Sequence, residues 1–433
     1  MSQNKPSLRL GSVDYGAVPA GLNDFFRRFH EGDLLGHREF RGEGDDQWAP
    51  FVEIEGTPVR DLQIALREHG FYPHGDIDGI FGYRTLSSVR LFQEYVRNVE
   101  NRMDIGTPDG IVGSRTHDHL ERWRAEGKQA DWLNVSATNP SPEHRYWIEI
   151  LMQYREINLG HPISVVIDMV NNFFAPADTI KTADWEFKPE DIHLIGIRRH
   201  EWRGTKERQN DDVFVLLVNG LVFKFYGSTD PNPSPKRRPD EPYIVRGQHR
   251  YRFGWHKLRD PQRVYRAFRP EGPGVLICRD FDYDDALTDA DFPGGLSAEP
   301  TINIHWGGRG ISNWSAGCQV ICGARYVNHL NKKVDCTAYA ARNYTELPES
   351  TRGAYNVLLD ILTVFAPSVS VLTGSRLYYT LLYERDFQLQ ASGGEALGAA
   401  GLAVLAGLGE AVLAQVKELV AVDNLVDRLI RDA

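Results

Sequence analysis

A histidine and a cysteine separated by a short loop are the residues of this sequence best suited to do chemistry. His305 ends the segment TINIH, and Cys318 follows it after twelve intervening residues. A thiolate is the attacking form of cysteine, and a nearby imidazole makes it available at neutral pH. The pair therefore predicts acyl transfer through a thioester.

The residues around this pair predict the local structure that would present it. Residues 301–305 alternate and are rich in β-branched side chains, so we expect a strand that ends at the histidine. Gly307 and Gly308 let the chain turn sharply after that strand and leave room for a ligand. The small residues Ser315 and Gly317 keep the thiol accessible and expose backbone N–H groups beside it.

This segment resembles the catalytic motif of YkuD-type L,D-transpeptidases, in which a histidine on a strand precedes a Ser-His-Gly-Cys block. The match covers the base, the nucleophile and two small residues: His305, Ser315, Gly317 and Cys318. Ala316 stands where the family usually has a second histidine, and Gln319 and Val320 follow the cysteine in place of an apolar residue and an arginine. The spacing is also shorter than is typical. These departures leave the nucleophile and base intact, and they leave open the substrate and the choice between transfer and hydrolysis.

The resemblance implies a mechanism without a metal or organic cofactor. Cys318 would attack the carbonyl of a diamino-acid residue in a stem peptide, and His305 would take the thiol proton and later protonate the leaving amine. Backbone N–H groups at Gly317 and Cys318 would hold the oxyanion, and Ser315 would orient the imidazole. Water would then give an L,D-carboxypeptidase or endopeptidase, and an amine would give an L,D-transpeptidase. We expect the flanking residues to contact the substrate: Trp306, Gly307, Gly308, Trp314 and Gln319.

A second block contains an internal repeat. Residues 59–96 have helical apolar spacing around the turn DGIFG at 78–82, and a second turn, DGIVG, recurs at 109–113, thirty-one residues later. The block resembles the small three-helix peptidoglycan-binding module over about residues 57–124; a generic pair of helical hairpins is the alternative. The resemblance implies wall-binding residues in the two turns: Asp78, Gly79, Phe81, Gly82, Asp109, Gly110 and Gly113.

Composition limits the class of protein. A chain of 433 residues can hold about two or three domains, and its formal net charge of −10 argues against a nucleic-acid partner. Its four cysteines are too few and too scattered for a disulfide framework, although one bridge is left open. Cys322 and Cys336 fit no common zinc spacing with His305, so we interpret them as buried small hydrophobes.

The sequence thus predicts a multidomain protein with a small all-α wall-binding domain and a mainly β catalytic domain, a YkuD-like β-sandwich with helical additions. The expected divisions are an unassigned N-terminal extension, the wall-binding domain, the catalytic domain and a Gly/Ala-rich helical tail: 1–50, 51–125, 140–390 and 391–433.

Local signals predict several elements of the catalytic domain. Asn219 and Gly220 supply the positive φ angles of a two-residue turn, which indicates a hairpin between strands 213–218 and 221–226. Further elements are expected as short strands at 243–245, 251–253, 275–278 and 376–383, and as a helix at 352–364. We interpret His249 and His256, in an aromatic strand, as structural rather than catalytic. The aspartates between 280 and 291 resemble a calcium loop only loosely and favour a solvated loop.

The two ends of the chain bear on how the protein would reach the cell wall. The N-terminal sequence lacks the basic and then apolar pattern of a secretory leader, which predicts synthesis in the cytoplasm and action at the cell wall after delivery. Candidate routes are a phage lysis or tail system, a contractile injection apparatus, or cell lysis. The uncharged residues 396–409 are too few to span a bilayer of about 30 Å, so we favour a helix packed on the body or a partner over membrane contact.

A second function remains open. In that alternative the catalytic-like region is inactive, and the protein binds peptidoglycan as a structural or docking component of a phage tail or injection apparatus. The departures Ala316 and Gln319 favour this alternative, whereas the retained His305 and Cys318 favour an enzyme.

Overall fold

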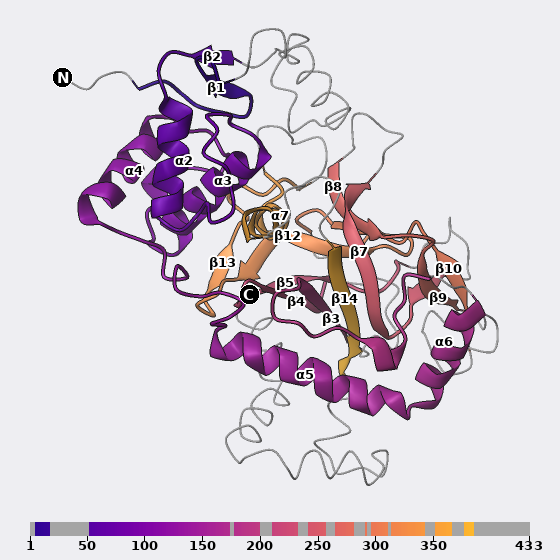
Figure 1. The fold of residues 1–433 in the computed structure, drawn as a ribbon. Coiled ribbons are helices and arrows are strands. Elements are labelled where there is room, and N and C mark those ends of the chain that lie inside the picture. Colours follow the sequence, from indigo (N-terminus) through magenta and orange to yellow (C-terminus); the bar gives the residue numbers. More distant parts are fainter. Residues whose placement is uncertain are drawn as a thin grey trace.

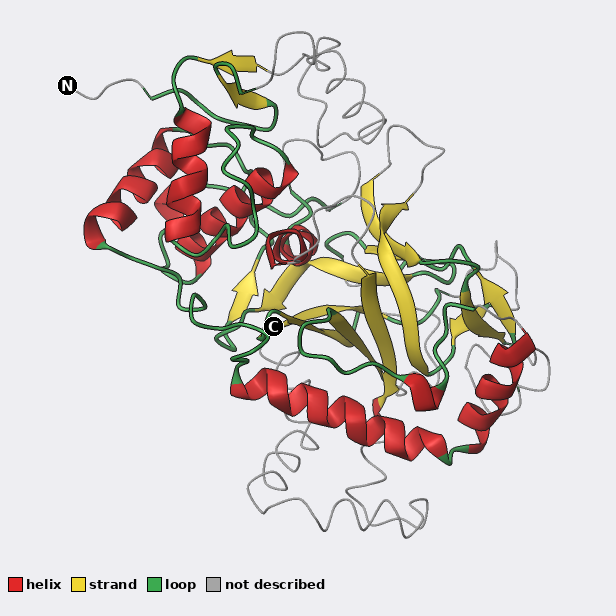
Figure 2. Cartoon of the chain, in the orientation of Figure 1, coloured by secondary structure: helices red, strands yellow, loops and turns green. Residues whose placement is uncertain are grey.

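The fold is described from a computed structural model, shown by sequence in Figure 1 and by secondary structure in Figure 2. The described residues are 5–17, 52–173, 177–199, 210–232, 241–256, 265–280, 291, 296–310, 313–342, 351–365 and 376–384. A compact group of helices lies beside a larger region built mainly of strands. The predicted multidomain arrangement, helical and then largely β, is confirmed.

The helical domain is built from α2 (Pro58–Glu68), α3 (Tyr83–Asn98) and α4 (Ser114–Glu126), with the short 3-10 helix η2 (Met103–Ile105) between the last two. Their apolar faces meet around an aromatic core. Trp123 lies in that core with Phe71 and Phe92, and the ring centroids of Phe92 and Trp123 are 5.2 Å apart. The predicted helices on either side of the first glycine turn are therefore present.

The helical domain also contains strands, which the expectation of an all-α domain missed. Strand β1 (Ser12–Asp14) pairs in parallel with β2 (Val52–Ile54). The Asp14 carboxylate accepts hydrogen bonds from the backbone N–H groups of Val59 (2.7 Å) and Arg60 (2.9 Å), so it caps the start of α2. The N-terminal segment, which carried no sequence signal, thus completes this domain.

Within the described residues, nine strands form one sheet that closes on itself. The order is β11 (Ile304–Trp306), β8 (Tyr265–Pro270), β7 (Gly247–His256), β14 (Arg376–Tyr383), β3 (His193–Arg198), β4 (Asp212–Val218), β5 (Leu221–Ser228), β12 (Gln319–Val327) and β13 (Lys333–Asp335). Strand β11 also pairs in parallel with β12, which joins the two sides of the sheet into a barrel-like ring of eight strands with β13 attached outside it. The expected sandwich of two facing sheets is not confirmed.

Helices and a small sheet complete the β region. Helix α5 (Pro142–Leu159) runs along one side of the barrel and continues into α6 (Pro162–Phe173), with η3 (Thr182–Asp184) following (Figure 1). The side chains of α5 pack on one face of β4, since Leu151 and Tyr154 share a buried cluster with Val213 and Val215. A three-stranded sheet in the described chain contains β6 (Pro242–Ile244), β9 (Val275–Arg279) and β10 (Ser297–Glu299).

Most predicted elements are found close to their expected bounds. The hairpin β4–β5 turns at Asn219 (φ 47°) and Gly220 (φ 78°), and β14 has the predicted bounds. Helix α7 (Ala354–Phe365) begins two residues later than predicted. The strand expected to end at His305 was wrong in its position: it starts at Ile304 and continues through Trp306.

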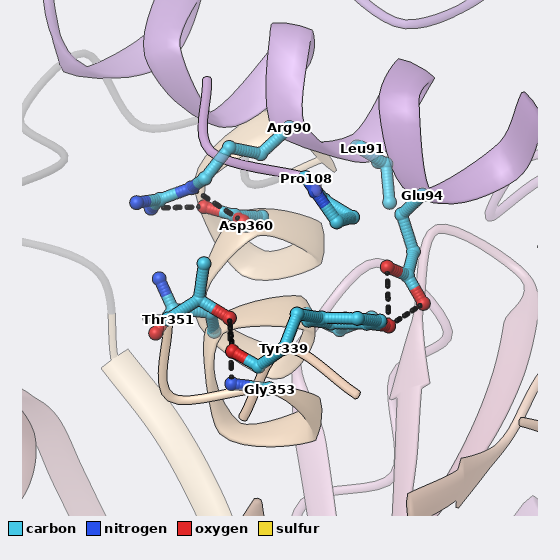
Figure 3. Close-up of a pocket in the computed structure, with 10 residues that line it drawn as sticks. Arg90, Leu91, Glu94, Pro108, Tyr339, Thr351, Gly353 and Asp360 are labelled. Atoms are coloured by element: carbon cyan, nitrogen blue, oxygen red, sulfur yellow. Dashed lines mark hydrogen bonds and ion pairs between the residues drawn. The ribbon is translucent and has the colours of Figure 1, made fainter. Parts of the chain in front are cut away.

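The helical domain and the barrel share one buried core through α3 and α7, which lie side by side (Figures 1 and 3). Glu94 of α3 is 3% exposed, and its carboxylate accepts hydrogen bonds from the hydroxyls of Tyr326 (2.9 Å) and Tyr339 (2.8 Å). Burial raises the pKa of Glu94, and these hydrogen bonds oppose that rise. The interface is therefore a specific, desolvated contact rather than a loose linker.

An ion pair lies one helical turn away on the same face of α3. Arg90 makes a bidentate contact with Asp360 of α7, with N···O distances of 2.9 and 2.6 Å, and both side chains are largely buried (Figure 3). Breaking such a pair is costly because it leaves a buried carboxylate without its cation.

Several expectations fall on residues outside the described ranges. These include the tail after residue 384, most of the N-terminal extension and most of the aspartate-rich run between 280 and 291. In the part of the chain that the structure describes, no helix combines the length and the apolar character needed to cross a membrane.

We expect Arg90→Ala to lower the free energy of unfolding by about 3 kcal/mol, because Asp360 stays buried without its partner. Denaturant titration followed by circular dichroism would measure the change. Glu126→Ala, which breaks the exposed pair with Arg122 (3.1 Å), is the matched control and should cost less than about 0.5 kcal/mol. Equal, small losses in both variants would contradict a specific interface.

Candidate active site and wall-binding domain

Cys318 lies immediately before β12, beside the start of β11. Its Sγ accepts a hydrogen bond from the backbone N–H of Asn303 (3.3 Å) and donates to the carbonyl of Thr301 (3.5 Å). The N–H of Gln319 donates to the carbonyl of Asn303 (3.0 Å), which fixes the register beside the thiol. The thiol is therefore held by the backbone of the neighbouring strand.

Burial raises the pKa of the Cys318 thiol above its usual value. The Asn303 N–H and a hydrogen bond from Ser315 act in the opposite direction, because both favour the thiolate. Among nearby charges, Glu299 raises the pKa and Arg269 lowers it. At neutral pH the thiol is thus mainly protonated, in agreement with its hydrogen bond to the Thr301 carbonyl.

His305 lies on β11, where its imidazole is oriented by the backbone. Its Nδ1 is 2.8 Å from the carbonyl oxygen of Trp306 and 3.0 Å from the hydroxyl of Tyr265. The Tyr265 hydroxyl itself donates to the Trp306 carbonyl (3.2 Å). Because a carbonyl can only accept, Nδ1 carries the hydrogen and Nε2 is left as the basic nitrogen.

The parallel pairing of β11 with β12 brings histidine and cysteine close together. Ile304 pairs with Gln319, so Cys318 lies beside Asn303, and His305 follows two residues further along. Strand spacing and rise put such diagonal neighbours about 8 Å apart at Cα, with their side chains on the same face. The predicted nucleophile and base are therefore neighbours across one strand pair.

The glycines of the motif allow close backbone approach. A side chain at Gly317 would lie 2.6 Å from Pro242, and one at Gly307 would lie 3.0 Å from Val320. Gly308 has a φ of 82°, a conformation that favours glycine. These positions therefore fix the path of the chain on both sides of the pair, whereas the expected oxyanion role of Gly317 stays a prediction.

The residues expected to contact substrate differ in exposure. Trp306 and Gln319 are 1% and 0% exposed and lie in the core, since alternation along the strands turns them away from the face of His305. Their burial argues against the expected contact. Trp314 is 66% exposed and remains a candidate for binding substrate. The Ser315 side chain lowers the pKa of the Cys318 thiol, while its expected contact with the imidazole stays a prediction.

Two residues that the sequence did not place in the site lie beside the pair. The His256 ring, at the end of β7, stacks on the His305 ring with centroids 4.0 Å apart. The side chain of Asn303 links to His256 through a 3.1 Å contact between Nδ2 and Nδ1. A polar residue two positions before the strand histidine was the available signal for Asn303. His256 was recognised in an aromatic strand but was interpreted as structural, because nothing in the sequence links that strand to His305.

The remaining cysteines do not extend the site. All four cysteines lie among the described residues and each is free. Burial raises the pKa of Cys278 to about 12 and also raises those of Cys322 and Cys336. Within the described ranges, no three His, Cys, Asp or Glu side chains are grouped so that they could hold a metal ion.

The wall-binding repeat is held by a buried glutamine in each copy. The Gln63 amide donates to Asp78 (2.8 Å) and Thr85 (3.2 Å), and its oxygen accepts from the N–H of Gly79 (3.0 Å). The Asp78 carboxylate also accepts from the N–H of Ile80 (2.9 Å), which closes the turn.

The second copy repeats this network. The Gln93 amide donates to Asp109 (3.2 Å) and Thr116 (3.1 Å) and accepts from the N–H of Gly110 (2.8 Å). Gly82 and Gly113 precede α3 and α4, and Phe81 is fully buried. The predicted wall-binding residues thus have structural contacts inside the domain, and their contact with the wall stays a prediction.

We expect Ser315→Ala to slow alkylation of Cys318 by iodoacetamide at pH 8, by up to about tenfold. Loss of the hydrogen bond raises the thiol pKa further, and one unit changes the thiolate fraction about tenfold. Because the pKa lies above its usual value, the rate should rise with pH in both proteins. Peptide mass spectrometry would measure it, with Ser297→Ala on β10 as control; an unchanged rate in Ser315→Ala would exclude this contact.

Comparison with known proteins identifies one part of the chain. Residues 55–120 match the family described as putative peptidoglycan binding domain. No curated protein matches the chain. A solved structure, a fused Zn-dependent amidase/peptidase/peptidoglycan-binding domain-containing protein from Clostridium acetobutylicum ATCC 824, is 13% identical over 75% of this chain and 95% of that chain, with a TM-score of 0.20. A likeness so low leaves the β region to be interpreted from its own residues. Residues 55–120 are a peptidoglycan-binding domain of the matched family.

Proposed function

We propose that this protein is a peptidoglycan-acting cysteine enzyme that forms a thioester on stem peptides. The observation that carries the proposal is the parallel pairing of β11 with β12, which makes His305 and Cys318 neighbours on one face. The Nδ1 of the imidazole donates to the Trp306 carbonyl, so Nε2 is the nitrogen that carries no hydrogen in the neutral ring and can act as the base. The resemblance to YkuD-type L,D-transpeptidases fits this arrangement.

The proposed reaction has two halves. His305 takes the proton of Cys318, and the sulfur adds to a stem-peptide carbonyl; the tetrahedral intermediate then collapses, and the imidazolium protonates the leaving amine. In the second half, water or the amine of another stem peptide attacks the thioester, which releases the thiol. Water makes the protein an L,D-carboxypeptidase or endopeptidase, and an amine makes it an L,D-transpeptidase.

The helical domain supports the choice of substrate. Residues 55–120 are a peptidoglycan-binding domain, and α3 of that domain packs directly on α7 of the β region. Binding to the wall would therefore hold the barrel close to stem peptides and raise their effective concentration at Cys318.

A non-catalytic wall-binding protein is the second candidate, and one observation favours it. The thiol of Cys318 has a raised pKa and donates a hydrogen bond to the Thr301 carbonyl. Both features are typical of a cysteine that is protonated and unreactive. In that case the domain at 55–120 would carry the whole function, as a structural or docking component.

We expect Cys318→Ala to abolish cleavage and crosslinking of peptidoglycan while binding to sacculi is retained, because the thioester needs the sulfur and the wall-binding domain does not. Mass spectrometry of muropeptides and co-sedimentation with sacculi would measure the two functions. Cys322→Ala, which removes a buried thiol that contacts the Arg309 carbonyl (3.6 Å), is the control and should keep activity.

Three outcomes separate the candidates. Activity that survives in Cys318→Ala would exclude the thioester mechanism. Inhibition of the wild type by a chelator would indicate metal chemistry instead. Binding without any change in muropeptides would favour the non-catalytic protein.

A further inference from the structure

We propose that His256 and Asn303 form a positioning pair that holds both the base and the nucleophile of this site. The inference rests on the proposed function and adds two residues to its machinery. It starts from contacts that join His256 on β7, Asn303 before β11, and the two reacting groups.

The first contact acts on the base. The rings of His256 and His305 are nearly parallel, with an interplanar angle of 22° and centroids 4.0 Å apart. Tyr265, paired with His256 across β7 and β8, contacts the His305 Nδ1 from the edge (3.0 Å). The imidazole is thus fixed on one face by His256 and at one nitrogen by Tyr265 and the Trp306 carbonyl.

The second contact acts on the nucleophile through Asn303. The Asn303 side-chain amide donates to the Nδ1 of His256 (3.1 Å), and the backbone N–H of the same residue donates to the Sγ of Cys318 (3.3 Å). One residue makes both contacts, so Asn303 links the His256 ring to the N–H group that stabilises the thiolate.

This arrangement suits the charge that forms in the proposed reaction. Proton transfer from Cys318 makes His305 an imidazolium, and a neutral ring stacked on it offers a polarisable π face. His256 accepts at Nδ1, so that nitrogen has no hydrogen and the ring is neutral in this contact. The pair therefore favours a charged His305 without placing a second charge beside it.

A neighbouring histidine on the same strand shows the contrast with a purely structural role. His249 is fully buried, and its nitrogens contact Thr179 (3.0 Å) and the Val245 carbonyl (2.9 Å) inside the core. His256 instead is only partly buried, and its contacts lead to the two residues of the candidate reaction.

Two variants of the full chain each remove one of the two contacts. His256→Phe keeps a ring on His305 but loses the acceptor for Asn303; His256→Asn keeps an acceptor within the same segment but loses the stack. The probe is iodoacetamide alkylation of Cys318, read by peptide mass spectrometry, together with kcat and KM on purified muropeptides. His117→Asn, in the helical domain, is the matched control for loss of a histidine.

We expect both His256 variants to alkylate about tenfold more slowly than the control and to lose roughly 10- to 100-fold in kcat with KM nearly unchanged, because small misplacements of reacting groups cost about that much. Wild-type alkylation in both variants, or a loss confined to KM, would overturn the proposal. Should His256→Phe fail to fold, His256→Asn alone decides. Alkylation needs no peptidoglycan, so an inactive wild type would refute the proposed function while the pairing is still tested.

Discussion

The parallel pairing of β11 with β12 is the interaction on which the rest of this structure depends. It closes the barrel-like ring, because β11 and β12 otherwise lie on opposite sides of the strand order. The same three paired residues fix the register of His305 against the segment that holds Cys318. A slip of one residue would turn His305 toward the core and Trp306 toward the site, since alternate side chains face opposite sides of a sheet. Closure of the fold and assembly of the candidate site are thus one event.

The junction of α3 with α7 fixes the orientation of the peptidoglycan-binding domain relative to the β region. A flexible linker would let the two parts sample many orientations, and the gain from binding would then depend on linker length. Here Glu94 and Arg90 make buried polar contacts across the junction, and the apolar residues on both sides belong to one core. Exposing that surface would leave buried charges unpaired and apolar area in water. The domain therefore holds a single orientation relative to Cys318, and in the proposed reaction this would restrict which stem peptides reach the thiol.

The sequence predicted the features that depend on near neighbours in the chain. The hairpin at Asn219 and Gly220 follows from turn chemistry, and the repeated DG turns follow from a local network around Gln63 and Gln93. His305 and Cys318 were found because they are close in sequence.

Pairings between distant segments were not predictable in the same way. Ring closure, the parallel strands β1 and β2, and the stack of His256 on His305 join segments that carry no local sign of each other. The burial of Trp306, in contrast, was predictable from the sequence. A strand that presents His305 to a ligand must turn the next side chain to the opposite face. Strict alternation would have removed Trp306 from the expected substrate contacts.

The raised pKa of Cys318 must be weighed against what the proposed reaction needs. Each unit of increase lowers the thiolate fraction about tenfold, but it also makes the thiolate about threefold more nucleophilic, since reactivity rises with basicity at a Brønsted slope of about 0.4–0.5. The net loss is therefore roughly threefold per unit, or less than about 1 kcal/mol. A single oxyanion donor contributes on the order of 10²–10³ in rate, which is several times larger as a free energy. Per unit of increase, the raised pKa of Cys318 thus costs the proposed reaction less than one well-placed N–H group contributes. For this reason the protonated resting thiol is compatible with catalysis, and the position of the imidazole that accepts its proton becomes the decisive variable.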